Sequence, residues 1–292
     1  MKQNKLIILQ NLLVDIYTKE GKNMNKNKLI IAIVLLLSFI LTGCSSLKVD
    51  EKYIYDDSNY SFGNMSFEET INEIKVDWLV GDIIIQKSEN EELIIREDTD
   101  ANIQDEYKMH YLLSEDSLDI KFAGSFEKLT YNFKVKKLYI YLPAKINEII
   151  INSVTSDVDV NYVTIDSLNI KSVSGDVNIV NTQVDELQIS SVSSEIMIFD
   201  SELKTASLTT ISGDIGFKYN NPLEQLNITT VDGNILIYIS EETPFGAKFN
   251  STTGKFISNL SYNKEDKIYI FNNANVIYDV TTVSGDLKIL KK

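Results

Sequence analysis

A turn phrase that returns at a nearly fixed period limits what this chain can fold into more than any other feature. The phrase reads SVTSDV at 153, SVSGDV at 172, SVSSEI at 191, TISGDI at 210 and TVDGNI at 230, and TVSGDL follows at 282. The first four copies are evenly spaced, and the fifth comes one position later than that spacing gives. A fixed period of this length is typical of a repeat protein in which each repeat adds one unit to a stack.

Hydrophobic residues keep the register of the turn phrase and fall into six columns. Around the first turn, residues 149 and 151 alternate with polar residues, as do residues 158 and 160, which is the pattern of a strand with one buried face. The columns are Ile149, Leu168, Leu187, Ala206 and Leu226; Ile151, Ile170, Ile189, Leu208 and Ile228; Val154, Val173, Val192, Ile211 and Val231; Val158, Val177, Ile196, Ile215 and Ile235; Val160, Ile179, Ile198, Phe217 and Ile237; and Ile165, Val184 and Leu203.

The pattern predicts an all-β fold, a parallel β-helix or β-solenoid with rungs of about 19–20 residues. Valine and isoleucine dominate the columns, and no helical stripe runs through them. Equivalent residues then stack about 4.8 Å apart, as in any parallel ladder. We expect a single-stranded solenoid with right-handed coiling, because parallel crossovers are right-handed by default.

Looser copies of the pattern flank the regular rungs. The segment 74–86 predicts an early rung, and 92–97, 117–122 and 137–143 predict further strands. Late rungs are predicted at 252–256 and 279–290, with a hairpin-like insertion over 259–273 between them.

The run KLYIYLPAKINEIIINSVTSDVDV at 137–160, the SVSGDV rungs and the closing TVSGDLKIL resemble a bacterial domain of unknown function whose members are called putative adhesins. The resemblance covers residues 67–292. It implies a β-helical envelope protein and brings no catalytic residues with it. "Adhesin" is a label by analogy, since solenoids have many functions.

Residues 24–43 have the features of a lipoprotein signal peptide. Lys26 and Lys28 precede an apolar run, Leu29 to Leu41, which is shorter than the roughly 20 residues of a membrane-spanning helix. Leu41, Thr42 and Gly43 then form a lipobox before Cys44, the only cysteine. We expect a lipid on Cys44; the alternatives are a plain secretory signal or a buried free thiol. A single cysteine excludes an intramolecular disulfide.

The segments on either side of the signal peptide receive separate interpretations. Residues 1–23 are interpreted as leader sequence read in frame, with translation starting at Met24; the alternative is a genuine extension from Met1. Residues 44–66 are polar and aperiodic, which predicts a flexible tether, and residues 67–292 form the solenoid domain.

The acid of the turn phrase recurs as Asp157, Asp176, Glu195, Asp214, Asn234 and Asp286. We expect each side chain to accept backbone N–H bonds in its own turn. A Ca²⁺ ladder is the alternative, but calcium requires six to eight oxygens and each rung supplies one carboxylate. Neither a metal nor a cofactor is therefore assigned.

Outside the turn phrase, few residues are candidates for a catalytic or binding site. His110 is the only histidine and Arg96 the only arginine, and no residues are singled out as catalytic. Tyr162, Phe199, Tyr219 and Tyr238 follow the second strands of successive rungs. They predict either corner packing or a flat stacking surface for a glycan or peptide.

The net negative charge of the chain limits the kinds of partner that it can bind. The net charge is −14; a chain beginning at Cys44 keeps 22 basic and 40 acidic side chains, a net charge of −18. Such a surface repels nucleic acid. We expect a non-catalytic, extracytoplasmic lipoprotein, held at the cell membrane by lipid on Cys44, that displays an adhesin-like binding or envelope-structure module for a glycan or envelope protein. The alternative is an enzyme acting on cell-wall or extracellular polysaccharide.

Overall fold

The computed structural model describes residues 51–129, 133–219, 221–274 and 276–292. Their contacts divide the chain into two units, and the smaller one contributes a single described strand pair. In it, β1 (Glu51–Tyr53) lies antiparallel to β9 (Phe126–Leu129). All other described strands belong to the larger unit, residues 55–125 and 133–292.

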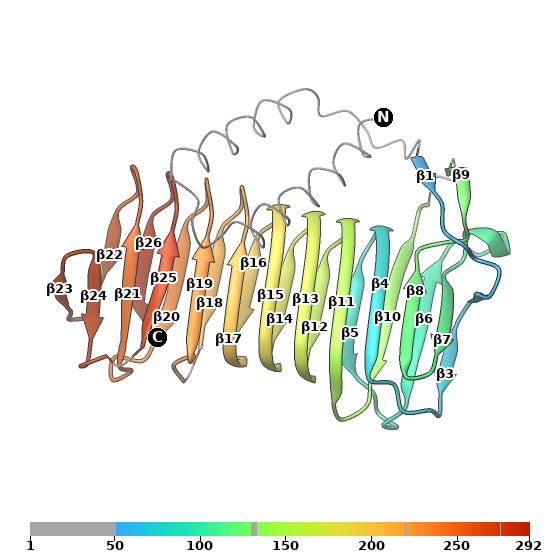
Figure 1. The fold of residues 1–292 in the computed structure, drawn as a ribbon, viewed down its shortest axis with the longest axis horizontal. Coiled ribbons are helices and arrows are strands. Elements are labelled where there is room, and N and C mark those ends of the chain that lie inside the picture. Colours follow the sequence, from blue (N-terminus) through green and yellow to red (C-terminus); the bar gives the residue numbers. More distant parts are fainter. Residues whose placement is uncertain (1–50, 130–132, 220, 275) are drawn as a thin grey trace. The chain divides into compact units, whose positions relative to one another are not determined.

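The larger unit consists of two long sheets, which we call the long-strand sheet and the short-strand sheet (Figure 1). In spatial order the long-strand sheet contains β2 (Ser61–Phe62), β7 (His110–Ser114), β8 (Ser117–Lys121), β4 (Glu73–Val80), β11 (Ile146–Thr155), β13 (Thr164–Ser174), β15 (Gln183–Ser193), β17 (Glu202–Thr209), β19 (Gln225–Thr229), β25 (Ile277–Thr281), β21 (Phe245–Asn250), β24 (Ile268–Phe271) and β23 (Asn263–Glu265).

The short-strand sheet contains, in spatial order, β3 (Met65–Phe67), β6 (Leu93–Thr99), β10 (Lys136–Leu142), β5 (Ile83–Lys87), β12 (Val158–Asn161), β14 (Val177–Val180), β16 (Ile196–Phe199), β18 (Ile215–Lys218), β20 (Ile235–Ile239), β26 (Leu287–Lys291) and β22 (Phe256–Ser258). The described helical structure is limited to one 3₁₀ turn, η1 (Asp105–Tyr107). Among the described residues, no helix is long and apolar enough to cross a membrane.

The predicted solenoid is confirmed, because each repeat supplies one strand to each sheet and neighbouring repeats pair in parallel. In the long-strand sheet, Ile151 lies opposite Ile170, and Ile170 lies opposite Ile189. In the short-strand sheet, Val158 lies opposite Val177, which is the same shift along the chain. All five of these side chains are buried. The apolar columns therefore form the core between the sheets.

One column differs from the prediction. Val154 and Val173 are only half-buried, whereas Ser153 and Ser172, which precede them, are buried. The strand continues its period-2 alternation through 149, 151 and 153, so the inward position falls on the hydroxyl residue. A buried column of hydroxyl side chains replaces the expected third apolar column: Ser153, Ser172, Ser191, Thr210, Thr230 and Thr282.

The order of rungs at both ends differs from their order in the sequence. The early rung, β4 and β5, lies between the β11 and β12 rung and an outer rung made of β8 and β10. At the other end, β25 and β26 lie between the β19 and β20 rung and the outer β21 and β22 rung. Antiparallel strands then cover the outer rungs, with β7 and β6 at one end and β24 at the other. The predicted late rungs and the hairpin insertion are therefore present, but the last rung in sequence is not the last in space.

The expected tether, residues 44–66, also differs from the structure. Residues 44–50 lie outside the described residues, and 51–53 form β1. Within the larger unit, the Tyr55 hydroxyl donates to the Ala123 carbonyl at 2.7 Å, and Phe62 of β2 pairs with His110 of β7. The first contact comes from one aromatic side chain and the second from a strand of two residues, and a search for apolar periodicity detects neither. The folded body therefore begins before residue 67.

Candidate functional site

The expected lipid-attachment site lies outside the described residues. Cys44 and the lipobox residues Leu41, Thr42 and Gly43 belong to the part of the chain that the structure leaves undescribed, so lipidation stays a prediction.

The acidic column of the turns links neighbouring rungs. Asp157 Oδ1 accepts the backbone N–H of Asp176 at 2.8 Å, and Asp176 Oδ1 accepts that of Glu195 at 3.0 Å. The same bond joins Asp214 to the N–H of Asn234 at 2.7 Å. Each of these side chains therefore accepts an N–H from the next rung in space. The expectation that it would accept an N–H from its own turn was wrong. The column has an architectural role, because every such bond ties two rungs together.

The stacking of the turns also limits which residue can stand directly before the acid. Gly175 has φ +109°, and a Cβ there would lie 2.2 Å from the carbonyl oxygen of Ser156 in the adjacent turn. Gly213 repeats this with φ +132° and 2.0 Å to the Ser194 oxygen. Positive φ is costly for residues that carry a Cβ. Positions 175 and 213 therefore require glycine, because a side chain there would meet both a positive φ and the carbonyl oxygen of the adjacent turn.

Nothing in the described residues supports the calcium alternative. No group of three or more His, Cys, Asp or Glu side chains lies close enough together there to hold a metal ion. The turn carboxylates instead use oxygens on backbone N–H groups of the next rung.

The four aromatic residues of the second-strand corners do not form one surface. Tyr162 is 65% exposed at a corner with φ +57°. Tyr219 is buried, and its ring packs edge-on against Phe217 and Tyr278. Burial raises the pKa of the Tyr219 hydroxyl well above its ordinary value. The column combines a core residue with an exposed corner, so it offers no continuous stacking platform.

The single histidine lies on β7 and the single arginine on β6. His110 is buried in β7, its Nδ1 lies 3.0 Å from the Lys108 carbonyl oxygen, and its ring packs 5.8 Å from that of Phe62. Arg96 is exposed on β6. His110 thus has the contacts of a packing histidine.

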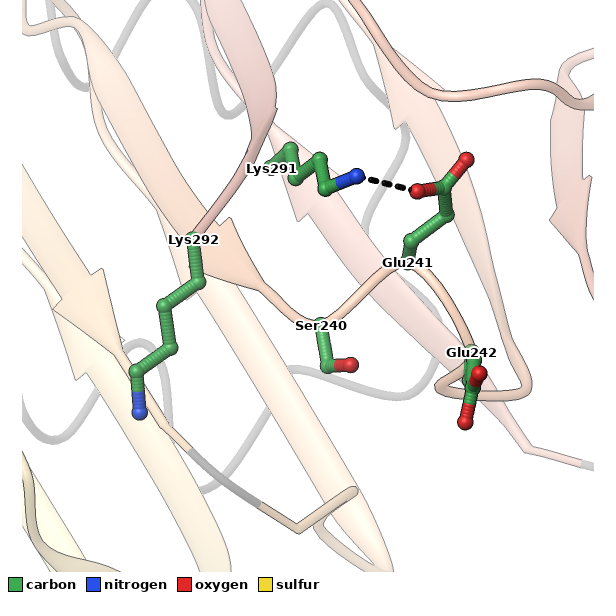
Figure 2. Close-up of a pocket in the computed structure, with 5 residues that line it drawn as sticks. All are labelled: Ser240, Glu241, Glu242, Lys291 and Lys292. Atoms are coloured by element: carbon green, nitrogen blue, oxygen red, sulfur yellow. Dashed lines mark hydrogen bonds and ion pairs between the residues drawn. The ribbon is translucent and has the colours of Figure 1, made fainter.

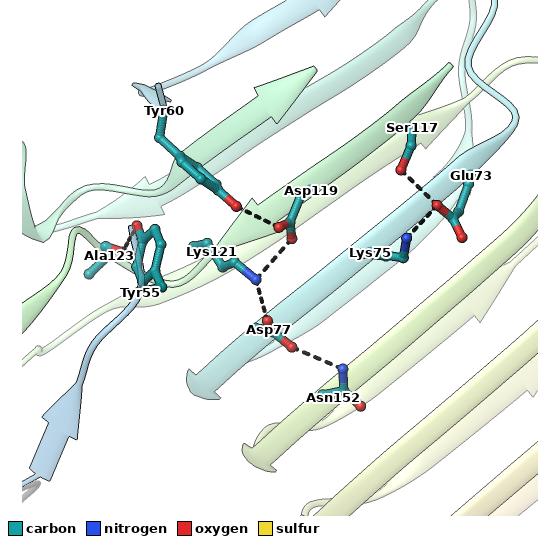
Figure 3. A network of polar contacts seen from close by, with 10 residues as sticks. All are labelled: Tyr55, Tyr60, Glu73, Lys75, Asp77, Ser117, Asp119, Lys121, Ala123 and Asn152. Carbon is teal, nitrogen blue, oxygen red and sulfur yellow. Dashed lines mark hydrogen bonds and ion pairs between the residues drawn. The ribbon is translucent and has the colours of Figure 1, made fainter. Parts of the chain in front are cut away.

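A polar network covers the outer face of the long-strand sheet over β4, β8 and β11 (Figure 3). Lys121 Nζ lies 2.5 Å from Asp77 and 3.1 Å from Asp119. Asn152 donates to the other oxygen of Asp77 at 2.9 Å, and the Tyr60 hydroxyl donates to Asp119 at 2.5 Å. Burial alone would lower the pKa of Lys121, but the two carboxylates raise it overall. Lys121 is therefore paired with both carboxylates, and the network links β4, β8 and β11.

A buried cation that the sequence analysis missed lies in the outer rung at the β6 end. The Lys136 side chain is 1% exposed, forms an ion pair with Glu97, and donates from Nζ to the Tyr107 carbonyl at 2.7 Å. Its Nζ also lies between three rings, 4.7 Å from Phe122, 5.0 Å from Phe133 and 5.4 Å from Trp78. Burial lowers the pKa of Lys136 to about 8, although Glu97 opposes the shift. Lys136 occupies an inward position of β10, in line with the apolar residues Leu138, Ile140 and Leu142. The period-2 pattern of the strand is therefore the only feature of the sequence that indicates its burial.

A hollow of about 330 Å³ is lined by Ser240, Glu241, Glu242, Lys291 and Lys292 (Figure 2). Lys291 and Glu241 form an ion pair across it, which raises the pKa of Lys291. Both partners are more than half exposed. This hollow carries little net attraction for a charged ligand, since its central charges are matched and solvated.

A second hollow of about 210 Å³ lies on the outer face of the long-strand sheet, over β13, β15, β17 and β19. Along β17 its floor is Thr205 and Ser207, which are short. Residues with longer side chains stand on the neighbouring strands, Glu186 and Gln188 on β15 and Gln225 and Asn227 on β19. Short side chains between longer ones produce a groove along β17. We call this the β17 groove.

The chain is similar in sequence to one described protein family. The profile of the family described as Toastrack DUF4097 matches the chain twice, over residues 71–215 and 144–290. The overlapping matches agree with a body made of repeated rungs. None of the curated proteins compared with the chain matches it.

Several solved structures are similar to the chain at low sequence identity. A protein described as a putative adhesin from Bacteroides fragilis NCTC 9343 is 16% identical, with a TM-score of 0.50, over 80% of this chain and 98% of its own. A putative adhesin from Parabacteroides distasonis ATCC 8503 is 17% identical, with a TM-score of 0.41, over 82% and 99%. A putative lipid binding protein from the same organism is 14% identical, with a TM-score of 0.46, over 81% and 98%. At these identities the likeness concerns the fold alone.

Proposed function

The chain belongs to the Toastrack family DUF4097, and from that premise we propose that it is a non-catalytic, adhesin-like binding module displayed outside the cell membrane. A solenoid suits this role because its stacked rungs build long faces that can contact an extended partner. The name of the structurally similar putative adhesin from Bacteroides fragilis supports a surface role.

The observation that carries the proposal is the outer face of the long-strand sheet. Over β13 to β19 its side chains stand in parallel rows, one residue per rung, because the strands pair in register. One such row is Asn169, Gln188, Ser207 and Asn227. Repeated hydrogen-bonding groups at rung spacing fit a partner that is itself extended and repetitive.

The second element of the proposal is a lipid anchor on Cys44, which would hold the module at the extracytoplasmic face of the membrane. The sequence supports it through the basic segment at Lys26 and Lys28, the apolar run and the lipobox, in that order. One acyl chain binds a membrane only marginally, whereas two chains anchor it stably. The diacylglyceryl group that a lipobox cysteine receives provides two.

The anchor is tested by labelled fatty acid and membrane fractionation of Cys44→Ala, with Ser46→Ala as the matched control. Label should enter the parent and Ser46→Ala but not Cys44→Ala. Absence of label from the parent, with unchanged fractionation of Cys44→Ala, would contradict the anchor.

The binding role is tested separately with the whole chain carrying Cys44→Ala, kept in one mild detergent. We expect saturable binding to isolated cell envelopes from which protein has been removed. Absence of saturable binding to envelopes, both before and after protein removal, would contradict the proposed function.

A further inference from the structure

The β17 groove has the chemistry of a site for a neutral, hydroxyl-rich polymer. We infer that it binds a neutral glycan chain, which deepens the proposed binding function and rests on it.

The lining consists mainly of amides and hydroxyls. Asn169, Gln188, Gln225 and Asn227 contribute amides, and Ser167, Thr205 and Ser207 contribute hydroxyls. Amides and hydroxyls each offer both donors and acceptors. Sugar hydroxyls do the same, so such a lining matches a glycan at many positions without requiring a charge on the ligand.

Part of this hydrogen-bonding capacity is unused within the described structure. Asn169 donates from Nδ2 to Gln188 Oε1 at a long 3.3 Å. Asn169 Oδ1 is shielded from solvent and accepts no hydrogen bond from any described residue. Buried polar atoms normally have partners, so this acceptor is unsatisfied as it stands, and a rotation of the Asn169 amide about its broad terminal torsion would turn it toward a ligand hydroxyl in the groove.

The dimensions of the groove favour a chain over an enclosed small molecule. The strands β15 and β19 flank β17, so their backbones are about 9 to 10 Å apart at ordinary strand spacing. A volume of 210 Å³ is below the roughly 300–1,000 Å³ of pockets that enclose small ligands. The floor also has no aromatic ring to hold an isolated sugar. A polymer that lies in the groove and continues past it fits this geometry better.

Charge argues against an anionic ligand. Glu186 is the one charged residue in the lining, and the whole chain has a net charge of −14. A polyanion would be repelled by both. The lining also contains only two apolar residues, Leu187 and Ala206, and both are nearly fully buried, so a lipid chain finds little surface there.

The test compares two matched tyrosine substitutions on the outer face, in the whole chain carrying Cys44→Ala. Ser207→Tyr fills the floor of the groove, whereas Thr281→Tyr places the same ring on β25, outside the lining. Maltohexaose and chitohexaose are the probes, titrated by calorimetry in one detergent. The groove predicts binding of at least one probe, a loss of about tenfold or more with Ser207→Tyr, as expected when two or more hydrogen bonds are lost, and a change within about twofold with Thr281→Tyr.

Two further measurements guard against a folding artefact and test the charge of the ligand. Side-chain amide signals of Asn169, Gln188, Gln225 and Asn227 should shift in nitrogen-15 spectra when the probe is added to the parent, which needs no variant. Raising the salt concentration about tenfold should leave neutral-probe affinity within about twofold, because salt screens charge–charge attraction and a neutral ligand has none to lose.

The contrary outcomes separate the inference from the proposed function. Equal binding by Ser207→Tyr and the parent, or shifts confined to residues outside the groove, would overturn the site. Envelope binding without affinity for either probe, or binding only to anionic phosphatidylglycerol vesicles, would overturn the neutral glycan while leaving a binding module. Absence of any saturable envelope binding would remove the proposed function as well.

Discussion

Asp157 and Asp176 occupy the same position in successive turns, and the carboxylate of the first accepts the backbone N–H of the second at 2.8 Å. The bond repeats between Asp214 and Asn234 at 2.7 Å and between Asn234 and Asp286 at 3.2 Å. Stacked carboxylates repel one another. The bonds to backbone N–H groups offset this repulsion, because an ionised acceptor makes a stronger hydrogen bond than a neutral one.

Asp176→Ala should lower the free energy of unfolding by about 1 to 2 kcal/mol, because the Glu195 N–H loses its acceptor. Asp176→Asn should cost less than about 0.5 kcal/mol, since an amide oxygen keeps the acceptor, as Asn234 does naturally. Urea melts of both variants measure this. Adding EDTA to the parent should leave its melting temperature unchanged; a fall on chelation that calcium reverses would restore the metal interpretation.

Gly175→Ala should be strongly destabilising, by about 2 to 4 kcal/mol, because a Cβ meets the Ser156 carbonyl oxygen at 2.2 Å in a backbone with φ +109°. Ser156→Ala is the matched control at the same turn position one rung earlier. Its hydroxyl is buried without a partner in the described residues, so removal should be neutral or slightly stabilising. Thermal melts that rank the two variants in the opposite order would mean that the turns do not stack as described.

Ile170→Ala should cost about 2 to 5 kcal/mol, through lost burial and the cavity that remains between Ile151 and Ile189. Lys171→Ala, on the adjacent outward position, should cost no more than about 0.5 kcal/mol. Ile170→Asp should prevent stable folding, because it buries a carboxylate without a partner. Denaturant melts compare the variants, and equal costs for the two alanine substitutions would contradict the assigned faces of β13.

The pH dependence of stability should report on Lys136. Its pKa is lowered to about 8 in the folded chain against 10.5 ordinarily. Between these values the unfolded chain holds a proton that the folded chain has released, so the free energy of unfolding rises with pH. From pH 7 to 9.5 the gain should be about 2 kcal/mol at 1.36 kcal/mol per pH unit above 8.

Lys136→Met should abolish that gain, and Lys137→Met, on the outward face of the same strand, should retain it. Urea melts at both pH values provide the measurement. An unchanged pH slope in Lys136→Met would assign the effect to other groups.

The sequence predicted those features of the fold that arise from contacts between residues one repeat apart. Ile151, Ile170 and Ile189 share a column because each lies one full repeat from the next, and a parallel ladder places such residues together. The turn acids were recognised as architecture for the same reason. Their donors were misassigned, because a column shows which side chains stack but not whether a side chain reaches its own backbone or that of the next rung.

Most of the features that the sequence did not predict depend on contacts between residues that are not one repeat apart. Lys136 meets Glu97 and the ring of Trp78 from strands far apart in sequence. Tyr60 reaches Asp119, 59 residues away, and so fixes a segment whose composition resembles a tether. The β17 groove arises from differences in side-chain length between adjacent rungs, which become visible only once Thr205 is placed opposite Glu186 and Gln225.

The position of the first and last rungs in sequence has a mechanical consequence. Tension that reaches β4 acts on a strand hydrogen-bonded along both edges, to β8 and β11, and β25 is likewise held between β19 and β21. In an ordinary solenoid a pulled terminal strand unzips from one neighbour, breaking its bonds in succession. Here a pulled β4 or β25 must shear two ladders together, so these rungs resist unravelling more than the edge strands β2 and β3, which pair along one side only.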